Sequence, residues 1–273
     1  MIKQVCVITG GGSGIGLATA KQMPKDKIIV VTGRTLTKLE HAVKELKNEG
    51  YEAYAKVCDT SDCEQVCSLA EYAASLGEIK HVIHAAGLSP AMAKPEQLVR
   101  VNALGTVYIN REFSKRMKGG SVIVDVSSNS AYALPKLMGS KRTFALVESD
   151  EAAFLKKMLR FSRIIKDHYK ASGLAYALSK KFVIWYAAKC AFEYGARNIR
   201  VVSVSPGLIA TDMGRLEQKE GGDLLKTAAE KRMGTPEELG FAIATVADER
   251  NGYLAGVDVL CDGGSIIGKQ FVK

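Results

Sequence analysis

The sequence lacks the features that mark several classes of protein. Its 273 residues contain no uninterrupted apolar stretch of roughly 20 residues, the length that a membrane-spanning helix needs. The six cysteines form no Cys-x-x-Cys pair and lie mostly in strand or helix patterns, which favours reduced packing residues over disulfides or a metal site. No signal peptide is expected, because Met1 to Gln4 leads directly into an apolar run. We therefore expect a cytoplasmic protein with no bound metal and no membrane partner.

The net charge of +9 comes without a basic motif interleaved with aromatic residues, so no nucleic-acid partner is expected. A basic surface attracts anionic ligands by electrostatic steering, and a phosphorylated cofactor or a carboxylate-bearing substrate would fit it. A solvated face that binds nothing is the alternative interpretation. The charge alone therefore leaves the ligand open.

Strand-like and helix-like patterns alternate along the chain. Residues 36–48 indicate a helix clearly, because leucines and a valine form one stripe opposite charged residues. Seven apolar runs predict strands, near residues 4–9, 27–32, 53–58, 81–85, 121–126, 199–205 and 256–261. These runs are continuous rather than alternating, which indicates a parallel sheet covered by helices on both faces. With 47% hydrophobic residues and no internal repeat or linker, residues 1–273 are expected to form one α/β domain.

A glycine-rich turn joins the first predicted strand to a helical pattern. The strand ends at Thr9, and the turn has the spacing Gly10-x-x-x-Gly14-x-Gly16. A strand, a glycine turn and a helix in this order hold a phosphate at the helix N-terminus, where unpaired N–H groups and the helix dipole favour an anion. The spacing differs from the standard G-x-G-x-x-G fingerprint, and a plain flexible loop is the alternative.

Tyr176 and Lys180 are four residues apart in a helical pattern, so their side chains share one helix face. A cation beside a phenol stabilises the phenolate and lowers the pKa of the phenol, which makes it a usable proton donor or acceptor near neutral pH. The spacing alone occurs by chance in many helices. The glycine turn, together with the pair Ser127-Ser128 at the end of the predicted strand 121–126, makes this a candidate active site.

Together these residues resemble the short-chain dehydrogenase/reductase family, and the resemblance covers essentially the whole chain. The matching segments, in chain order, are the turn Thr9 to Gly16, Asp59 after the third strand, the degenerate His84-Ala85-Ala86-Gly87, Asn102, Ser128, Tyr176, Lys180, Ser205 to Thr211, and Asp262-Gly263-Gly264. His84 stands where the family usually has asparagine.

The resemblance implies a Rossmann-like, doubly wound parallel sheet of seven strands and a four-residue active site. In such a site Tyr176 exchanges a proton with the substrate oxygen while a hydride passes to or from a nicotinamide. Lys180 lowers the tyrosine pKa and binds the nicotinamide ribose, Ser128 orients the substrate oxygen, and Asn102 holds a water that links Lys180 to solvent. The cofactor-binding residues that it implies are Gly10, Ser13, Gly14, Ile15, Gly16, Arg34, Thr35, Asp59, Thr60, Ala86, Gly87, Tyr176, Lys180, Pro206, Gly207, Ile209 and Thr211.

The second predicted strand bears on the choice of cofactor. An acidic residue at its end would bind a ribose 2′-hydroxyl and repel a 2′-phosphate. Gly33 stands where the family's NAD-type aspartate would fall, and Arg34 follows it. Arginine pairs bidentately with phosphate, which favours NADP over NAD. An ordinary surface arginine is the alternative.

One region departs from the family pattern. Ser128 and Tyr176 are 48 residues apart, whereas roughly a dozen residues separate them in most members, so residues 133–168 are an insertion. Its second half predicts a helix with one apolar stripe of Phe154, Leu155, Met158, Phe161, Ile164 and Ile165. A helical insertion before the tyrosine resembles the hydroxysteroid dehydrogenase/carbonyl reductase branch. The stripe predicts a wall of the substrate pocket, a contact in a homo-dimer or homo-tetramer, or both.

The resemblance leaves the substrate open. The insertion and the basic surface suit a bulky, apolar alcohol such as a hydroxysteroid or a bile acid, oxidised to or formed from the ketone. A general carbonyl or 3-oxoacyl reductase is the first alternative. A non-catalytic protein that senses dinucleotides is the second, but the complete set of Asn102, Ser128, Tyr176 and Lys180 argues against it.

Overall fold

A computed structural model describes residues 3–135, 138–221 and 225–271 of the chain. Its centre is one seven-stranded sheet with the order β3-β2-β1-β4-β5-β6-β7, and all neighbouring strands are parallel. The strands are β1 (Gln4–Thr9), β2 (Ile28–Gly33), β3 (Glu52–Val57), β4 (Glu78–His84), β5 (Ser121–Val126), β6 (Ile199–Pro206) and β7 (Asp258–Cys261). The predicted parallel sheet of seven strands is therefore confirmed.

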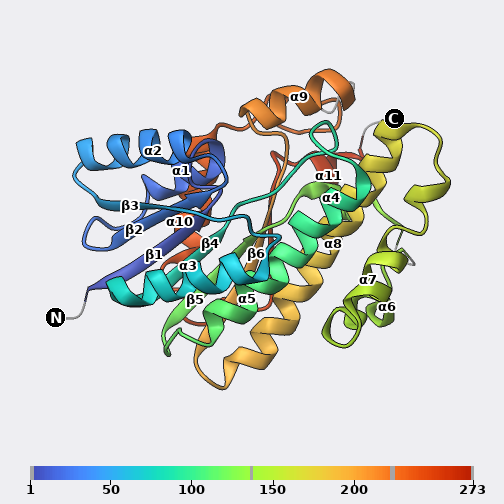
Figure 1. The fold of residues 1–273 in the computed structure, drawn as a ribbon. Coiled ribbons are helices and arrows are strands. Elements are labelled where there is room, and N and C mark those ends of the chain that lie inside the picture. Colours follow the sequence, from blue (N-terminus) through green and yellow to red (C-terminus); the bar gives the residue numbers. More distant parts are fainter. Residues whose placement is uncertain (1–2, 136–137, 222–224, 272–273) are drawn as a thin grey trace.

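Helices cover both faces of this sheet (Figure 1). The helices α3 (Cys63–Leu76), α5 (Gly105–Ser114) and α8 (His168–Gly195) bury their apolar residues against one face. The helices α1 (Gly14–Ala20), α2 (Leu36–Asn48) and α10 (Pro236–Ala247) cover the other face. The strands β2, β5 and β6 are almost entirely buried because helices cover both of their faces. In α2 the predicted stripe is buried at Leu39 and Leu46, whereas Leu36 at the helix start is half exposed.

Shorter helices lie near the carboxyl ends of the strands. They are α4 (Pro95–Val99), which runs into a π-helical turn over Arg100–Leu104, together with α9 (Asp212–Gly221) and α11 (Ser265–Gly268). Within the described ranges, no helix is both long and apolar enough to cross a membrane.

The insertion forms two short helices that pack on the outer side of α8. These are α6 (Lys141–Ala145) and α7 (Glu151–Met158), connected by a 3₁₀ turn over Leu146–Glu148. The Phe154 ring of α7 lies 4.9 Å from the Phe182 ring of α8, and the Phe144 ring of α6 lies 5.3 Å from it, edge to face. The insertion therefore extends the hydrophobic core across α8, away from the sheet.

The predicted helical stripe of the insertion is wrong beyond Met158, where α7 ends. Phe161 and Ile164 are 42% and 77% exposed and pack on no core. After α7 the chain continues as a 3₁₀ turn over Ser162–Ile164, where the Ser162 hydroxyl donates a 3.0 Å hydrogen bond to the main-chain oxygen of Leu159. Asp167 then starts α8, since its carboxylate accepts a hydrogen bond from the main-chain N–H of Lys170.

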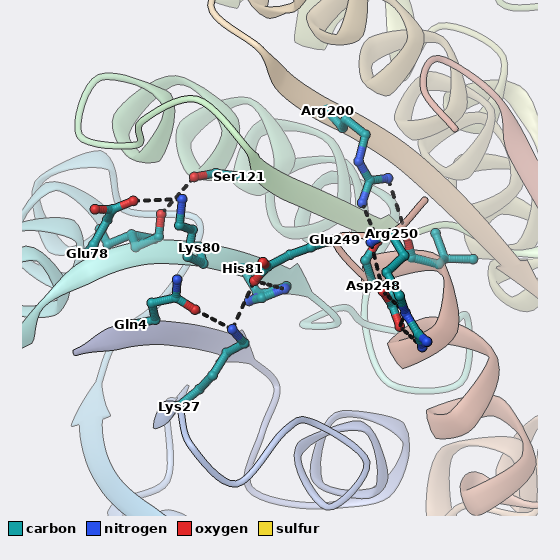
Figure 2. A network of polar contacts seen from close by, with 12 residues as sticks. Gln4, Lys27, Glu78, Lys80, His81, Ser121, Arg200, Asp248, Glu249 and Arg250 are labelled. Atoms are coloured by element: carbon teal, nitrogen blue, oxygen red, sulfur yellow. Dashed lines mark hydrogen bonds and ion pairs between the residues drawn. The ribbon is translucent and has the colours of Figure 1, made fainter. Parts of the chain in front are cut away.

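A polar network holds the amino ends of the strands together, at the opposite edge from the helices α9 and α11 (Figure 2). The buried Lys27 ammonium donates to the side chains of Gln4 and Glu249, the latter at 2.9 Å. Arg200 donates to the main-chain oxygens of Asp248, at 2.9 Å, and Leu254, at 3.0 Å. These contacts fix the end of α10 to strands β1, β2 and β6.

Candidate active site

A cavity of about 1180 Å³ opens at the carboxyl ends of the strands. It lies where the strand order reverses between β1 and β4, the position at which open α/β sheets bind ligands. Single-ligand sites have roughly 300–1,000 Å³, so this cavity has room for a dinucleotide and a substrate together. Every residue predicted to bind the cofactor lines it, and so do the predicted catalytic residues Ser128, Tyr176 and Lys180. Their roles stay predictions.

The glycine turn brings main chain close to main chain at the centre of the cavity. Gly10 has φ +66, and a Cβ atom there would lie 3.0 Å from the main chain of Ala85 and Ala86. Thr9 Oγ1 accepts a 3.0 Å hydrogen bond from the Ala86 N–H, which joins the ends of β1 and β4. The first turn of α1 contains no acidic residue, so its N-terminus keeps the electrostatic character that suits a phosphate. These residues fit a dinucleotide diphosphate.

Two basic side chains line the cavity after β2. Arg34 directly follows the last residue of β2, and Lys38 lies in the first turn of α2. Both are exposed, and the chain meets no acidic residue between the end of β2 and Glu40. The sequence reasoning missed Lys38. The signal was available, because a residue on the first turn of a helix that follows the strand end faces the same ligand as the strand end itself.

The segment after β3 lies at the same end of the cavity. Asp59 Oδ1 accepts hydrogen bonds from the Ser61 N–H at 2.9 Å and from the Ser61 hydroxyl at 2.7 Å. Thr60 is buried against Gly105 of α5. The turn is thus held rigid beside the place predicted for the adenine, and the adenine contact of Asp59 stays a prediction.

The segment after β6 closes the opposite end. The Gly207 N–H donates to the Cys261 main-chain oxygen at 3.0 Å, and Ile209 forms an isolated parallel bridge with Gly234. The Thr211 hydroxyl accepts a hydrogen bond of 3.1 Å from the Gly214 N–H in the first turn of α9. Pro206, Gly207, Ile209 and Thr211 are therefore placed on the side predicted for the nicotinamide, under α9.

Tyr176, Ser128 and Lys180 meet in the middle of the cavity. The Ser128 hydroxyl acts on the Tyr176 phenol and lowers its pKa, and it accepts a 3.2 Å hydrogen bond from the Ser130 N–H. Lys180 Nζ lies 5.9 Å from the centre of the Tyr176 ring and donates to the Val126 main-chain oxygen at 2.8 Å. The helix α8 thus presents both residues on one face, as the spacing of four predicts.

The electrostatics differ from the sequence expectation that Lys180 sets the pKa of the phenol. Burial raises the pKa of Tyr176, the nearby Glu217 raises it further, and only the Ser128 hydrogen bond lowers it. Burial also lowers the pKa of Lys180 to about 8, while Glu217 and Asp125 raise it. The expected lowering is wrong for the geometry observed, because removal from water outweighs a cation whose Nζ hydrogen-bonds to Val126.

Asn102 lies behind the cavity rather than in its lining. It belongs to the π-helical turn Arg100–Leu104, a distortion that is frequent at functional sites. Its Oδ1 accepts from the Leu88 N–H at 2.9 Å, and its Nδ2 donates to the Leu88 oxygen at 3.0 Å and to Ser179 Oγ at 3.3 Å. A Cβ atom at Gly87 would lie 3.2 Å from Asn102 Oδ1 and 3.3 Å from Lys180 Nζ. Asn102 therefore fixes the segment between it and Lys180.

The remaining wall of the cavity is mostly apolar. Its apolar residues include Leu88, Pro90, Met92, Val101, Tyr169, Leu208, Met213, Leu225 and Ile266. Charged side chains also line it, among them Asp212, Arg215, Glu217, Glu230, Arg232, Glu238, Asp262 and Lys269. Of the described residues of the insertion, only Ala133 lines the cavity, so the predicted pocket wall of Phe154 and Met158 is wrong. Those two side chains are instead buried in the core that α7 shares with α8. Glu217 is a second residue that the sequence reasoning missed.

Two family models match the chain. The one described as short chain dehydrogenase matches residues 4–139, and the one described as enoyl-(acyl carrier protein) reductase matches residues 157–265. The residues between the two matches, 140–156, all lie inside the insertion of 133–168. Its two ends, 133–139 and 157–168, lie within the matches.

Individual proteins are similar to this chain over nearly its whole length. It is 28% identical over 271 residues to a short-chain dehydrogenase/reductase of Alternaria brassicicola, with 97% of each protein covered. It is 26% identical over 264 residues to the 3-oxoacyl-(acyl-carrier-protein) reductase of Pseudomonas aeruginosa, with 96% of each covered. A short chain dehydrogenase of Burkholderia cenocepacia, solved in complex with NADP, has the same fold with a TM-score of 0.75 at 20% identity, over 96% of this chain and 97% of that one. The chain therefore belongs to the short-chain dehydrogenase/reductase family of NAD(P)-dependent oxidoreductases.

Proposed function

We propose that this protein is an NADP-dependent oxidoreductase that interconverts a bulky, apolar secondary alcohol, such as a hydroxysteroid, and the corresponding ketone. The observation that carries the proposal is the meeting of Ser128, Tyr176 and Lys180 in a cavity whose other end is a glycine turn. A proton-transferring group and a dinucleotide site in one cavity are what hydride transfer to a carbonyl requires.

The preference for NADP rests on Arg34 and Lys38. Two cations at the end of β2 provide a bidentate and a point-charge partner for a 2′-phosphate. Gly33 contributes no carboxylate there, so the ribose of NAD has no acceptor at the strand end. The Burkholderia cenocepacia structure with NADP bound supports the same choice by likeness of fold.

The residues of the site divide the work of the reaction. When bound, the nicotinamide supplies or accepts the hydride. Tyr176 holds the proton that moves to or from the substrate oxygen, and the Ser128 hydroxyl orients that oxygen beside it. Lys180 places a cation beside the phenol, and Asn102 holds the main chain of Leu88, next to Gly87.

The apolar wall supports a bulky hydrophobic substrate. Leu88, Met92, Val101 and Tyr169 line the same cavity as Tyr176, and their contact surface favours a large hydrocarbon skeleton over a small polar alcohol. Burial raises the pKa of Glu217 to about 7, so above that pH its carboxylate repels an anion in the cavity. A neutral hydroxysteroid therefore fits this wall better than the carboxylate end of a bile acid placed beside α9.

A general carbonyl or 3-oxoacyl reductase is the second candidate. The similarity to the Pseudomonas aeruginosa 3-oxoacyl-(acyl-carrier-protein) reductase over 96% of both chains favours it. Its substrates carry a long flexible chain instead of a rigid ring system, so the two candidates differ in what the apolar wall must enclose.

That the protein forms a homo-dimer or homo-tetramer is also a proposal, and light scattering tests it.

The test is turnover measured at 340 nm with equal concentrations of NADPH and NADH. The substrates are a ketosteroid, an oxo bile acid, a 3-oxoacyl thioester and a small cyclic ketone. The proposal expects NADPH and the ketosteroid to give the highest kcat/KM. Preference for the thioester establishes the second candidate, and equal use of NADH contradicts the cofactor assignment. Binding of NADPH without turnover of any ketone or alcohol would instead make the protein a dinucleotide sensor.

A further inference from the structure

A row of polar side chains crosses the sheet directly beneath the active site. In register, Thr9 of β1 pairs with His84 of β4, His84 with Asp125 of β5, and Asp125 with Ser203 of β6. Register partners on parallel neighbours point to the same face, here the face that α5 and α8 cover. All four residues are buried, and the family resemblance gives none of them a role.

Asp125 is the charged member of this row. Both of its carboxylate oxygens accept hydrogen bonds from Asn110 Nδ2 of α5, at 3.0 Å and 2.9 Å, and neither residue has any exposed surface. An isolated carboxylate is costly to bury, and one neutral amide does not balance its charge. A cation must therefore lie within reach for Asp125 to remain ionised.

That cation is Lys180. Its Nζ donates to the main-chain oxygen of Val126, the residue that follows Asp125, and the Lys180 side chain is itself buried. The attraction acts in both directions, since Asp125 raises the pKa of Lys180 and Lys180 lowers the pKa of Asp125. Burial has the largest effect on both groups, because it disfavours each charged form: it raises the pKa of Asp125 to about 7 and lowers that of Lys180 to about 8. Glu217 raises the pKa of Lys180 as well.

His84 does not supply the balancing charge. Thr9 Oγ1 accepts a hydrogen bond from the Ala86 N–H, and it is also hydrogen-bonded to His84 Nδ1 at 2.8 Å. Burial, reinforced by Lys180, lowers the pKa of His84 to about 3, so the ring is neutral at ordinary pH.

We propose that Asp125 is a positioning residue for the reaction: its carboxylate, held by Asn110, is the buried counter-charge that keeps Lys180 an ammonium behind Tyr176. This inference rests on the proposed function for its catalytic consequence. A cation close to a phenol favours its phenolate, and Lys180 Nζ lies 5.9 Å from the centre of the Tyr176 ring. Asp125 thus acts on the proton transfer only as far as Lys180 offsets the burial that raises the pKa of the phenol, and it does not touch the substrate.

Glu217 is the other described carboxylate that acts on Lys180. Glu217 and Asp125 differ in whether they also affect the pKa of Tyr176. Glu217 on α9 also raises the pKa of Tyr176, so it opposes the phenolate directly. Asp125 on β5 acts on Lys180 and has no such effect on the phenol. The neighbouring His84 on β4 is neutral, and Asn110 on α5 carries no charge. Asp125 is therefore the group whose removal weakens the cation alone.

The direct test follows the ionisation of Lys180 without any substrate. Protein labelled with ¹³C at lysine Cε is titrated by NMR, and a Lys180→Met sample identifies the signal. Asp125→Asn is expected to lower the titration midpoint of Lys180 by about 1 pH unit or more, the usual effect of losing a close opposite charge. Asp125→Ser, which leaves a smaller neutral acceptor for Asn110, is expected to do the same if Asp125→Asn folds poorly.

Ser121→Ala is the matched control, because Ser121 is a buried polar residue on the same face of β5 at its other end. It should leave the midpoint where it is in the parent protein. An unchanged Lys180 midpoint in both Asp125 variants overturns the proposal, whatever their stability.

A kinetic arm connects the result to the proposed function. In Asp125→Asn the acidic limb of the kcat/KM profile for alcohol oxidation should move to higher pH, because a weaker cation no longer stabilises the phenolate. If Asp125 had a purely structural role, kcat/KM would fall by the same factor at every pH and the acidic limb would not move. If the parent enzyme oxidises no alcohol, the proposed function fails while the NMR titration still decides the role of Asp125.

Discussion

Two hydrogen bonds join Lys180 to the end of β5. Lys180 Nζ donates to the Val126 main-chain oxygen at 2.8 Å, and the Lys180 main-chain oxygen accepts from the Ser127 hydroxyl at 2.8 Å. These bonds fix α8 against the strand that leads to Ser128. Because Ser128 and Tyr176 lie on the two elements joined in this way, the scaffold sets their relative position. The site is preorganised by main-chain contacts, although 48 residues separate the serine from the tyrosine.

Removal of one hydroxyl should abolish most turnover. Tyr176→Phe keeps the ring in its packing and deletes the proton donor, so kcat should fall by roughly 10²–10⁴-fold, the usual contribution of general acid–base catalysis. The dissociation constant for NADPH, measured by quenching of protein fluorescence, should change little. Tyr54→Phe, which removes a hydroxyl bonded to Glu52 on β3, is the control and should keep full activity. A Tyr176→Phe enzyme with near-normal kcat would disprove the mechanism.

A double change at the end of β2 should move the cofactor preference toward NAD. Gly33→Asp with Arg34→Leu adds a carboxylate and removes a cation, so it repels the 2′-phosphate and offers an acceptor to the 2′-hydroxyl. The new side chain has space, since a Cβ atom at Gly33 meets only Leu39 Cδ2 at 3.7 Å. The ratio of kcat/KM for NADPH to that for NADH should fall by at least about tenfold, the value of one charged contact.

The single change Lys38→Ala should raise KM for NADPH and leave KM for NADH nearly unchanged. Lys44→Ala is its control, because Lys44 is exposed on the same helix and does not line the cavity. Equal effects of Lys38→Ala on the two cofactors would show that Lys38 contributes only general surface charge.

The insertion should matter for stability and not for the choice of substrate. Phe154 has no exposed surface and packs on Phe182, so Phe154→Ala should lower the free energy of unfolding by about 3–5 kcal/mol. Phe161→Ala, in the same insertion but 42% exposed, should change it by at most about 0.5 kcal/mol. Urea unfolding measures both. KM for a ketosteroid and for a small ketone should shift by the same factor in Phe154→Ala, and a selective rise for the ketosteroid would restore the insertion as a pocket wall.

The sequence was sufficient for the sheet and for most of the cavity lining, because these depend on local patterns. Continuous apolar runs indicate buried parallel strands, and residues at the carboxyl ends of such strands converge on one edge of the sheet. Thr9, Arg34, Asp59 and Ser128 each follow or end a strand, so their meeting in one region was predictable.

Local patterns did not predict features that depend on strand register, on where a helix ends or on burial. Asp125 lies within an apolar run, and only the pairing of β4, β5 and α5 places it beside His84 and Asn110. The apolar stripe of the insertion continues past Met158 in the sequence, but α7 ends there and a 3₁₀ turn over Ser162–Ile164 follows. The pKa of Tyr176 depends on burial, which a spacing of four residues does not reveal.

The buried His81 should make the protein less stable in weak acid (Figure 2). It is 2% exposed, its Nε2 lies 3.8 Å from Glu249 Oε1, and burial, with help from Lys27, lowers its pKa from 6.5 to about 4. Below pH 6.5 His81 is protonated in the unfolded chain, whereas in the folded protein it stays neutral down to about pH 4. Its contribution to stability is therefore complete above pH 6.5 and is lost as the pH falls through this window.

The experiment compares the free energy of unfolding in urea at pH 7 and at pH 5, in the parent protein and in His81→Gln. The total change is not the readout, because Asp125 and Glu217, whose pKa values are raised to about 7, stabilise the fold as the pH falls. From pH 7 to pH 5, the free energy of unfolding should change in favour of the folded state by about 2 kcal/mol more in His81→Gln than in the parent protein. This amount corresponds to roughly 1.5 pKa units. His168→Gln, at an exposed position, should behave as the parent protein does. If the change from pH 7 to pH 5 were equal in His81→Gln and in the parent protein, His81 would gain a proton in the folded protein as easily as in the unfolded chain.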